Sequence, residues 1–518
     1  MRISDKKCSF GVFWLIIAIL YASAFTLAEF SGNPVDSFHG FLTLASQFAV
    51  VAAASASLIG LLALNRWVFA FTFPLLITLS ATATYYRLTL GLSITPMALE
   101  LTFVNDVNTW LTVVSWQLVV CDALALAAGI AAAVIRFRNV RPSGRMWVYG
   151  AVFLLGVLTP TVLVRRLKAP VINRVPFSFA YSVAEYLNNK AIVAEERNTF
   201  DNTPASCGTD SITVLVVIGE SLRPDHLDIN GYGRQTLPHM SKERNLVSIP
   251  KMKTEECFTH VSVPRIVTRA DSLHPERAYE EQSFITLFKK SGFRTIWISN
   301  QDATDTYVYF MHEADELEAV NSAKTSYSYD KWMDSDILPA LDGFLSTDNP
   351  RKLAVLHTIG SHWWYRSHYP DSLAVYKPEI NSRVVSELTH EQMVNSYDNT
   401  ILATDLFLKE VTDRLRDTNS VVVFISDHGE SLGENGMYLH AEAYDILRPT
   451  ACIIWYSDEF SRRYPEKVRN LRLNAGKEYW TDNIFHTVLD AGDIQTPELA
   501  PQMSILHNET EETDESRQ

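Results

Sequence analysis

Five long apolar runs near the amino terminus constrain the fold of this chain more than any other feature. Each run has roughly 18 to 25 residues, which is enough for an α-helix to cross the hydrocarbon core of a bilayer. A backbone in lipid must form all its hydrogen bonds internally, so such runs are expected to be helical. The sequence therefore predicts a membrane domain of five helices over residues 1–165, with the runs at about 10–29, 40–64, 67–86, 111–135 and 146–164.

Basic residues in the loops predict how these helices are oriented. Arg2, Lys6 and Lys7 precede the first run and four arginines follow the fourth run, whereas Arg87 is the only basic residue in the alternate loops. Loops rich in Lys and Arg stay in the cytoplasm, so the amino terminus is predicted to be cytoplasmic. The first run is too long for a cleaved secretory signal, and we interpret it as an anchor. After five crossings the rest of the chain lies outside the cytoplasm, although the basic residues within 165–168 argue weakly the other way.

After residue 210 the sequence alternates between short apolar strands and longer helical patterns. Such alternation predicts an α/β domain, with a mostly parallel sheet covered by helices on both faces, over residues 211–500. We predict that residues 166–210 form a linker with an amphipathic segment around 183–187, and that the acidic tail 501–518 is disordered. The strands are expected near 212–218, 293–299, 352–358, 420–426 and 450–456, and the helices near 280–291, 330–346, 389–417 and 477–491.

Charge and cysteine content restrict the partners and the compartment. The formal net charge of −14 excludes a general nucleic-acid-binding protein, because the phosphate backbone would be repelled. Cys207 and Cys257 lie in the outer domain and are candidates for a disulfide in an oxidising compartment. Cys452 lies in an apolar run and is expected to be a buried thiol. The pairing itself does not follow from the sequence.

Two apolar strands end in side chains that bind metals. Glu220 follows the strand near 212–218, and Asp427 and His428 follow the strand near 420–426, where Gly429 permits a turn. Parallel strands end at one edge of the sheet, so these side chains are expected to meet there, together with Thr259 at the start of a predicted helix. Their oxygen and nitrogen atoms suit zinc, and are open to manganese as a less favoured ion. A metal beside Thr259 would turn its hydroxyl into a usable nucleophile.

These motifs together resemble those of one known family. The segments at 217–221, 230–234, 259–264, 360–362 and 426–440 closely resemble the corresponding motifs of the bacterial phosphoethanolamine transferases. The resemblance implies an enzyme of the inner membrane with five spans and a periplasmic zinc domain that is alkaline-phosphatase-like or sulfatase-like.

The resemblance also implies a role for each matching residue. Zinc would be held by Glu220, Thr259, Asp427 and His428, with Thr259 as the nucleophile that carries phosphoethanolamine. The interpretation is physically consistent, because phosphoryl transfer needs charge neutralisation and in-line placement above all.

Four further residues are candidates for substrate binding. His362 and His440 match histidines that line the substrate site of the family and that can hold a second zinc; either could protonate the leaving oxygen. A pattern that some members use for the ethanolamine head group appears only partly here, as Thr102 and Asp106.

The expected donor is phosphatidylethanolamine, drawn from the lipid bilayer that holds the chain. The expected acceptor is lipopolysaccharide, on its lipid A or its core sugars, with periplasmic glucans or another envelope glycan next. Trp363, Trp364 and Tyr365, followed by Arg366 and His368, could hold a sugar face and a phosphate. The alternative for these aromatic residues is a place at the membrane interface, where Trp and Tyr are enriched.

Three other functions agree less well with the sequence. A sulfatase needs a modified Cys or Ser in a Cys-x-Pro-x-Arg context, whereas Cys257 stands seven residues before Pro264. A phosphoglycerol transferase of the same superfamily shares the five spans, the metal and the threonine, but the segment 230–234 favours phosphoethanolamine. A non-catalytic membrane sensor that kept the fold is disfavoured by the intact set of predicted metal ligands.

Overall fold

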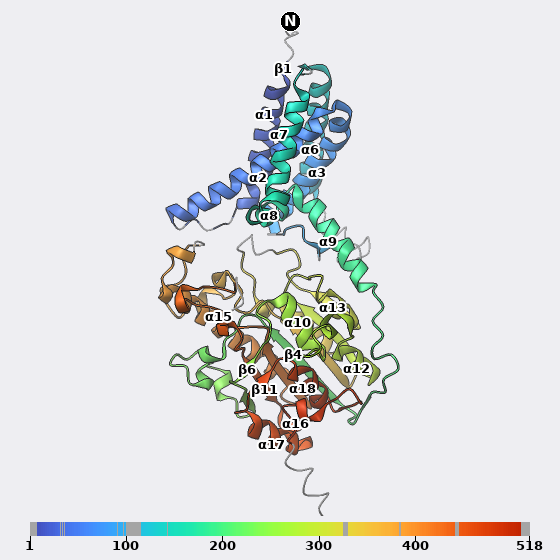
Figure 1. Cartoon of the computed structure of the whole chain (residues 1–518), viewed down its shortest axis with the longest axis vertical. Helices are drawn as coiled ribbons and strands as arrows, with labels where there is room; N and C mark the ends of the chain where they lie inside the picture. The colour runs from blue at the N-terminus through green and yellow to red at the C-terminus, as the bar shows by residue number, and fades with distance from the viewer. Residues whose placement is uncertain are drawn as a thin grey trace, which may run out of the picture. The chain divides into compact units, whose positions relative to one another are not determined.

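The computed structural model divides the chain into two compact units (Figure 1). Unit 1 comprises Met1–Leu187 with Ala323–Asp330, and unit 2 comprises Asn188–Ser322 with Lys331–Gln518. Thr102 and Asp106, the residues predicted to bind the head group, lie outside the residues that the structure describes. Those described residues are 8–31, 33, 35, 37–90, 92–96, 98–99, 115–141, 143–324, 330–382, 385–440 and 445–508.

Unit 1 contains the predicted membrane helices. Among its described residues, five helical segments are long and apolar enough to cross a membrane, which confirms the predicted number. The helix pair α3 (Arg66–Leu90) and α6 (Trp116–Arg138) packs closely, since a Cβ atom at Gly129 would lie 2.6 Å from the Cα atom of Pro74. The five segments are Phe10–Phe30, Phe38–Leu64, Arg66–Thr89, Trp116–Arg138 and Met146–Leu163, and the first, second and fifth contain α1 (Phe10–Tyr21), α2 (Phe38–Leu64) and α7 (Met146–Leu158).

The segment 166–210, predicted to be a linker, contains two helices. Helix α8 spans Arg165–Ile172, and α9 spans Phe177–Val193 and includes the amphipathic residues around 183–187. Val183 and Leu187 are exposed on α9.

Unit 2 is built on a seven-stranded sheet in the order β5-β11-β10-β4-β9-β7-β8. The five strands β10, β4, β9, β7 and β8 run parallel, while β11, near one edge, pairs antiparallel with both β10 and the edge strand β5. Every residue of β4 and β10 is buried, so both faces of the central sheet are covered, as predicted. The strands are β4 (Ile212–Gly219), β5 (Leu246–Ser248), β7 (Arg294–Ser299), β8 (Glu316–Ala319), β9 (Arg351–His357), β10 (Ser420–Ser426) and β11 (Cys452–Tyr456).

The predicted helices of unit 2 are present, but most begin later than the sequence pattern suggested. Ser283 caps α12, because its side chain accepts a hydrogen bond from the amide of Ile285. Thr389 caps α15 through a reciprocal capping box with Gln392. These helices are α10 (Thr259–Val267), α12 (Phe284–Lys290), α14 (Leu338–Leu345), α15 (His390–Asp413) and α18 (Asn483–Ala491).

The cysteines correct one prediction and confirm another. Cys207 and Cys257 are not joined to each other, so the disulfide suggested for them is not formed. Cys207 lies in β3 (Ser206–Cys207) and its Sγ atom donates to the carbonyl of Gly492, whereas Cys257 is buried just before α10. Cys452 is a buried thiol with 1% of its surface exposed, as expected.

Candidate metal centre

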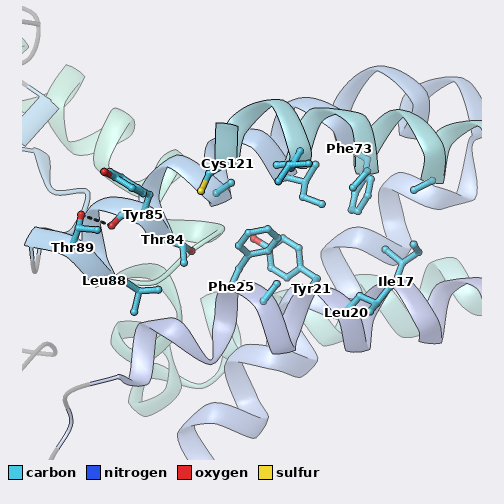
Figure 2. Close-up of a pocket in the computed structure, with 17 residues that line it drawn as sticks. Ile17, Leu20, Tyr21, Phe25, Phe73, Thr84, Tyr85, Leu88, Thr89 and Cys121 are labelled. Atoms are coloured by element: carbon cyan, nitrogen blue, oxygen red, sulfur yellow. Dashed lines mark hydrogen bonds between the residues drawn. The ribbon is translucent and has the colours of Figure 1, made fainter. Parts of the chain in front are cut away.

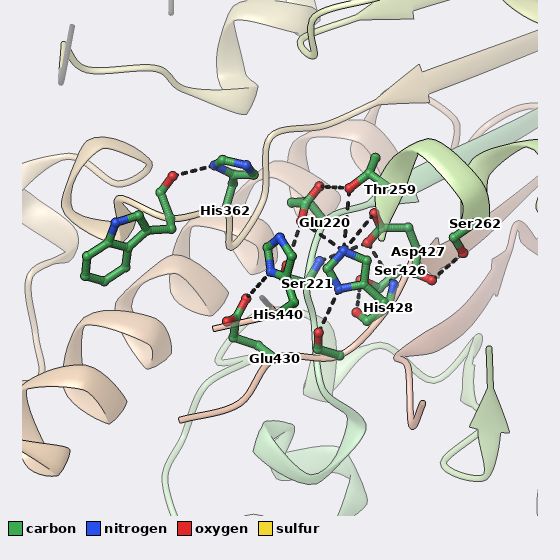
Figure 3. Close-up of polar contacts among 12 residues, drawn as sticks. Glu220, Ser221, Thr259, Ser262, His362, Ser426, Asp427, His428, Glu430 and His440 are labelled. Atoms are coloured by element: carbon green, nitrogen blue, oxygen red, sulfur yellow. Dashed lines mark hydrogen bonds and ion pairs between the residues drawn. The ribbon is translucent and has the colours of Figure 1, made fainter. Parts of the chain in front are cut away.

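The ends of two neighbouring parallel strands form the centre of the site (Figure 3). The last pair in the register of β4 and β10 joins Gly219 to Ser426, so Glu220 and Asp427 leave the sheet side by side. The amide of Asp427 still donates to the carbonyl of Gly219 at 3.0 Å, which keeps the two ends together. Topology therefore produces the meeting of carboxylates that the sequence predicted.

Thr259 is the first residue of α10 and approaches the same point from the other side. Its Oγ1 atom donates to Glu220 Oε2 at 2.9 Å and lies 3.5 Å from His428 Nε2. The hydroxyl of Ser262, one turn along α10, donates to the carbonyl of Asp427 at 2.6 Å. This contact fixes the start of the helix against the strand end. Free amides at a helix start favour an anion such as a phosphate beside Thr259.

The side chains at this point fit a metal ion. Glu220, Asp427 and His428 are buried and offer ligand atoms that lie within 4.8 Å of one another. His428 Nδ1 donates to the carbonyl of Gly429 at 2.7 Å, which leaves Nε2 of the neutral ring free to bind a metal. This Nε2 atom lies 3.6 Å from Glu220 Oε1 and 3.5 Å from Asp427 Oδ2.

Asp427 carries the most direct sign of a cation. Its Oδ1 atom accepts hydrogen bonds from the amides of Ser221 and His428, at 3.0 and 2.8 Å. Its Oδ2 atom is buried and accepts no hydrogen bond from any described residue. Burial, together with the negative charge of Glu220, raises the pKa of the Asp427 carboxyl to about 6. A buried carboxylate oxygen that accepts no hydrogen bond is expected to bind a positive ion.

The two predicted substrate histidines stand beside this cluster. The ring of His440 lies 4.6 Å from that of His428 and 6.3 Å from that of His362, measured between centroids. His440 Nδ1 lies 3.1 Å from Glu430 Oε2; burial lowers the pKa of His440, but Glu430 outweighs this effect and raises it to about 9. His362 Nδ1 donates to the carbonyl of Trp363. Both rings are therefore held by one nitrogen, which leaves Nε2 for a substrate.

Two further side chains hold Glu220, and sequence reasoning did not single them out. Ser221 Oγ donates to Glu220 Oε1 at 2.6 Å. Gln301 Nε2 donates to Glu220 Oε2 at 2.9 Å and to the carbonyl of Thr358 at 3.1 Å. Gln301 follows the end of β7, so a search for polar residues after every predicted strand would have found it.

The aromatic segment after His362 differs from what the sequence suggested. Trp364 and Tyr365 are buried, so neither ring offers a face to a sugar or to a membrane. Arg366 is paired with Asp371 at 2.7 Å and with Glu379 at 3.1 Å. His368 is also buried, and its Nδ1 atom donates to the carbonyl of Trp332 at 3.0 Å. Of the five residues proposed to hold sugar and phosphate, only Trp363 and Arg366 are partly exposed.

The fold and the strand-end cluster define an α/β domain of the alkaline-phosphatase type. The model of the sulfatase family matches residues 212–494, and the chain belongs to this family. Phosphoethanolamine transferase EptA of Escherichia coli K12 is 25% identical over 524 residues, which cover 93% of this chain and 94% of the relative. Kdo(2)-lipid A phosphoethanolamine 7''-transferase of Salmonella typhimurium is 32% identical over 285 residues, which cover 51% and 48%.

Solved structures show the same architecture. The integral membrane protein lipooligosaccharide phosphoethanolamine transferase A (EptA) of Neisseria meningitidis superposes with a TM-score of 0.54 at 21% identity, covering 95% of this chain and 98% of that one. The periplasmic domain of EptC of Escherichia coli, solved in complex with zinc, gives 0.54 at 21% identity, covering 59% and 89%. The resemblance to phosphoethanolamine transferases is thus confirmed, and the chain is a membrane protein.

Proposed function

We propose that the chain transfers phosphoethanolamine from phosphatidylethanolamine to lipopolysaccharide, on its lipid A or its core sugars, through a covalent adduct on Thr259. One observation carries the proposal: the Thr259 hydroxyl lies at a helix start, within 3.5 Å of both Glu220 Oε2 and His428 Nε2. Relatives named as phosphoethanolamine transferases, one of them a lipid A enzyme, support the choice of group and acceptor.

Glu220, Thr259, Asp427 and His428 would hold a zinc ion, with manganese as the less favoured metal. When bound, zinc would lower the pKa of the Thr259 hydroxyl and neutralise charge on the phosphoryl group. Ser221 and Gln301 orient the Glu220 carboxylate, and the carbonyl of Gly429 orients the His428 ring. These contacts hold the ligands before the substrate arrives.

In the first half of the reaction, Thr259 Oγ1 attacks the phosphorus of the donor. An Oγ1–P bond forms, the bond from phosphorus to the glycerol oxygen breaks, and diacylglycerol leaves. Glu220 Oε2 already accepts the hydrogen bond of the Thr259 hydroxyl, so this carboxylate takes up the proton and returns it to Thr259 in the second half. His440, whose pKa is raised to about 9 against burial by Glu430, supplies the proton to the glycerol oxygen.

In the second half, an oxygen of the acceptor attacks the same phosphorus and the Oγ1–P bond breaks. His440 takes back the proton of an acceptor hydroxyl, and Thr259 regains its own. His362, 6.3 Å from His440 between ring centroids, would contact the transferred group or, with His440, hold a second zinc. Two separate steps allow the lipid product to leave before the acceptor enters.

We further propose that the chain lies in the inner membrane of a bacterium, with its amino terminus in the cytoplasm and unit 2 in the periplasm. The basic residues around the first run support this orientation. Acceptors that are themselves anchored in the envelope would be within reach of such a site.

The adduct provides the test of this function. The purified full chain is incubated with phosphatidylethanolamine without acceptor and is then examined by intact-mass and peptide mass spectrometry. We expect one phosphoethanolamine group on the peptide that contains Thr259, and none in Thr259→Ala. An adduct on another residue, or no adduct in a preparation that turns over donor, would refute the mechanism.

A further inference from the structure

An apolar cavity of about 580 Å³ lies among the membrane helices of unit 1 (Figure 2). Its walls come from the first membrane segment, from α3 and from α6, and they include five alanines. Small residues usually bring membrane helices into contact. Here they leave a space instead, although α3 and α6 still touch nearby at Pro74 and Gly129. The alanines are Ala24, Ala81, Ala125, Ala128 and Ala132.

The cavity opens sideways on the surface that faces lipid. Leu20, Leu88 and Leu124 line it and are 61%, 59% and 66% exposed, so its rim is apolar and uncovered by the described residues. Tyr21 forms part of the inner wall. Its hydroxyl is hydrogen-bonded to Ser80 at 2.8 Å, so it presents no unpaired polar group to the cavity. A hydrocarbon chain can therefore enter from the bilayer without crossing a polar barrier.

One end of the cavity is more polar than the other. Thr84, Tyr85 and Thr89 line it near the end of α3, and Thr84 Oγ1 is buried without a hydrogen-bond partner among the described residues. The opposite end is lined by Phe73 and Ala132 and contains only hydrocarbon. Polar side chains therefore line one end of the cavity and apolar side chains the other, as in a lipid molecule (Figure 2).

The polar end faces the side of unit 1 from which the chain continues toward unit 2. The pairs Tyr85–Ser115 and Thr82–Asp122 show that α3 and α6 are antiparallel, so the end of α3 and the start of α6 share one side. The fifth membrane segment ends on that side too, at Leu163, because each crossing reverses direction.

We propose that this cavity binds one acyl chain of the phosphatidylethanolamine donor, and this inference rests on the proposed function. An acyl chain gains no hydrophobic free energy on leaving the bilayer, because the lipid around it is equally apolar. The cavity instead fixes the position of the donor. An acyl chain held there places the glycerophosphate of the same lipid on the membrane side from which the polypeptide continues into unit 2. A donor held on the membrane side to which unit 2 is tethered would be presented to that unit at a raised effective concentration.

The test fills the cavity from its open side. Ala128→Phe places a ring in the cavity, and Ala127→Phe is the matched control, because Ala127 is an exposed alanine on the same helix that does not line the cavity. Both variants are made in the full chain in detergent, with rates of Thr259 adduct formation measured for a long-chain and a dihexanoyl phosphatidylethanolamine. We expect Ala128→Phe to raise KM for the long-chain donor at least about threefold, with the dihexanoyl donor and Ala127→Phe unchanged.

A second measurement identifies the occupant. A phosphatidylethanolamine with a photoreactive group in one acyl chain is compared with a phosphatidylglycerol probe of the same chains. We expect the first probe to label peptides of α3 or α6 more strongly, and Ala128→Phe to remove this label. Equal labelling by both probes, or equal KM in both variants, would overturn the inference. Failure of the proposed function would look different, because then the wild-type chain would form no adduct with either donor.

Discussion

The sequence predicts functional residues in two regions of unit 2. In one region their side chains converge on a single point, whereas in the other most of them are buried in the core. At the ends of β4 and β10, Glu220, Asp427 and His428 point to one place, with Asp427 Oδ2 accepting no hydrogen bond from a described residue. In the aromatic segment after His362, Trp364 and Tyr365 point into the core.

Residue type alone is enough to predict a site only where the fold fixes the direction of the side chains. A parallel strand fixes the edge at which its last side chains emerge, so the direction of Glu220 and Asp427 follows from the sheet. Nothing comparable fixes the irregular segment after β9, where Tyr365 forms part of a 3-10 turn. In that segment the polar and aromatic side chains contact one another instead of a ligand, as the ion pair between Arg366 and Asp371 shows.

The largest expected effect is the loss of the nucleophile. Thr259→Ala should lower transfer at least about a thousandfold, because it removes the hydroxyl that contacts both Glu220 and His428 and that would form the bond to phosphorus. Thr259→Ser keeps the hydroxyl and should retain measurable transfer. The measurement is turnover of labelled phosphatidylethanolamine, and equal activity of the alanine and serine variants would contradict the assignment.

Removal of the proposed zinc ion should have the next largest effect. Zinc that binds only the folded chain at about 1,000 times its Kd would stabilise unit 2 by about 4 kcal/mol, so a chelator should lower the Tm. Asp427→Asn removes the negative charge and should abolish both zinc content and the response to chelator.

Asp405→Asn is the matched control for that change. Asp405 is also a buried carboxylate, but its oxygens accept from the amides of His239 and Met240. This variant should lose stability and still bind zinc. A chelator response that persists in Asp427→Asn would show that the metal lies elsewhere.

A smaller effect is expected from the orientation of Glu220. Gln301→Ala removes the amide that donates to Glu220 Oε2, and should weaken zinc binding about 10- to 100-fold without removing a ligand. Gln282→Ala is the control, because Gln282 is a buried amide that accepts from the amide of Phe200 instead. Competition with a zinc indicator measures both, and equal affinities for the two variants would contradict the role of Gln301.

The sequence predicted the architecture because its signals were long and periodic. Apolar runs and strand patterns depend on many residues, so the five membrane segments and the mostly parallel sheet were found. Helix starts were less accurate, since Ser283 sets the start of α12 by one local hydrogen bond. The suggested disulfide failed because spacing in the sequence does not place Cys207 beside Cys257.

Contacts around the site were harder to predict than the residues at its centre, Glu220, Asp427 and His428. Gln301 reaches Glu220 only because β7 and β4 flank β9, and this strand order is not written in any local pattern. The Glu430–His440 contact depends in the same way on how the chain turns after β10.

The smallest effect is expected from the substitution of Trp363, in the aromatic segment after His362. Its ring is half-buried and packs edge-on against Trp364 and Tyr365, with centroids 5.1 and 5.3 Å away. A half-buried ring offers little area to a sugar, so Trp363→Ala should lower transfer to lipopolysaccharide no more than about threefold and leave Thr259 adduct formation unchanged. Tyr365→Ala, by contrast, should destabilise unit 2 by about 3 to 5 kcal/mol, because that ring is fully buried. The two variants are compared by adduct formation, transfer to acceptor and thermal unfolding. A loss of tenfold or more in transfer by Trp363→Ala, with the adduct intact, would restore the sugar-binding hypothesis for this segment and remove the contrast with the strand ends.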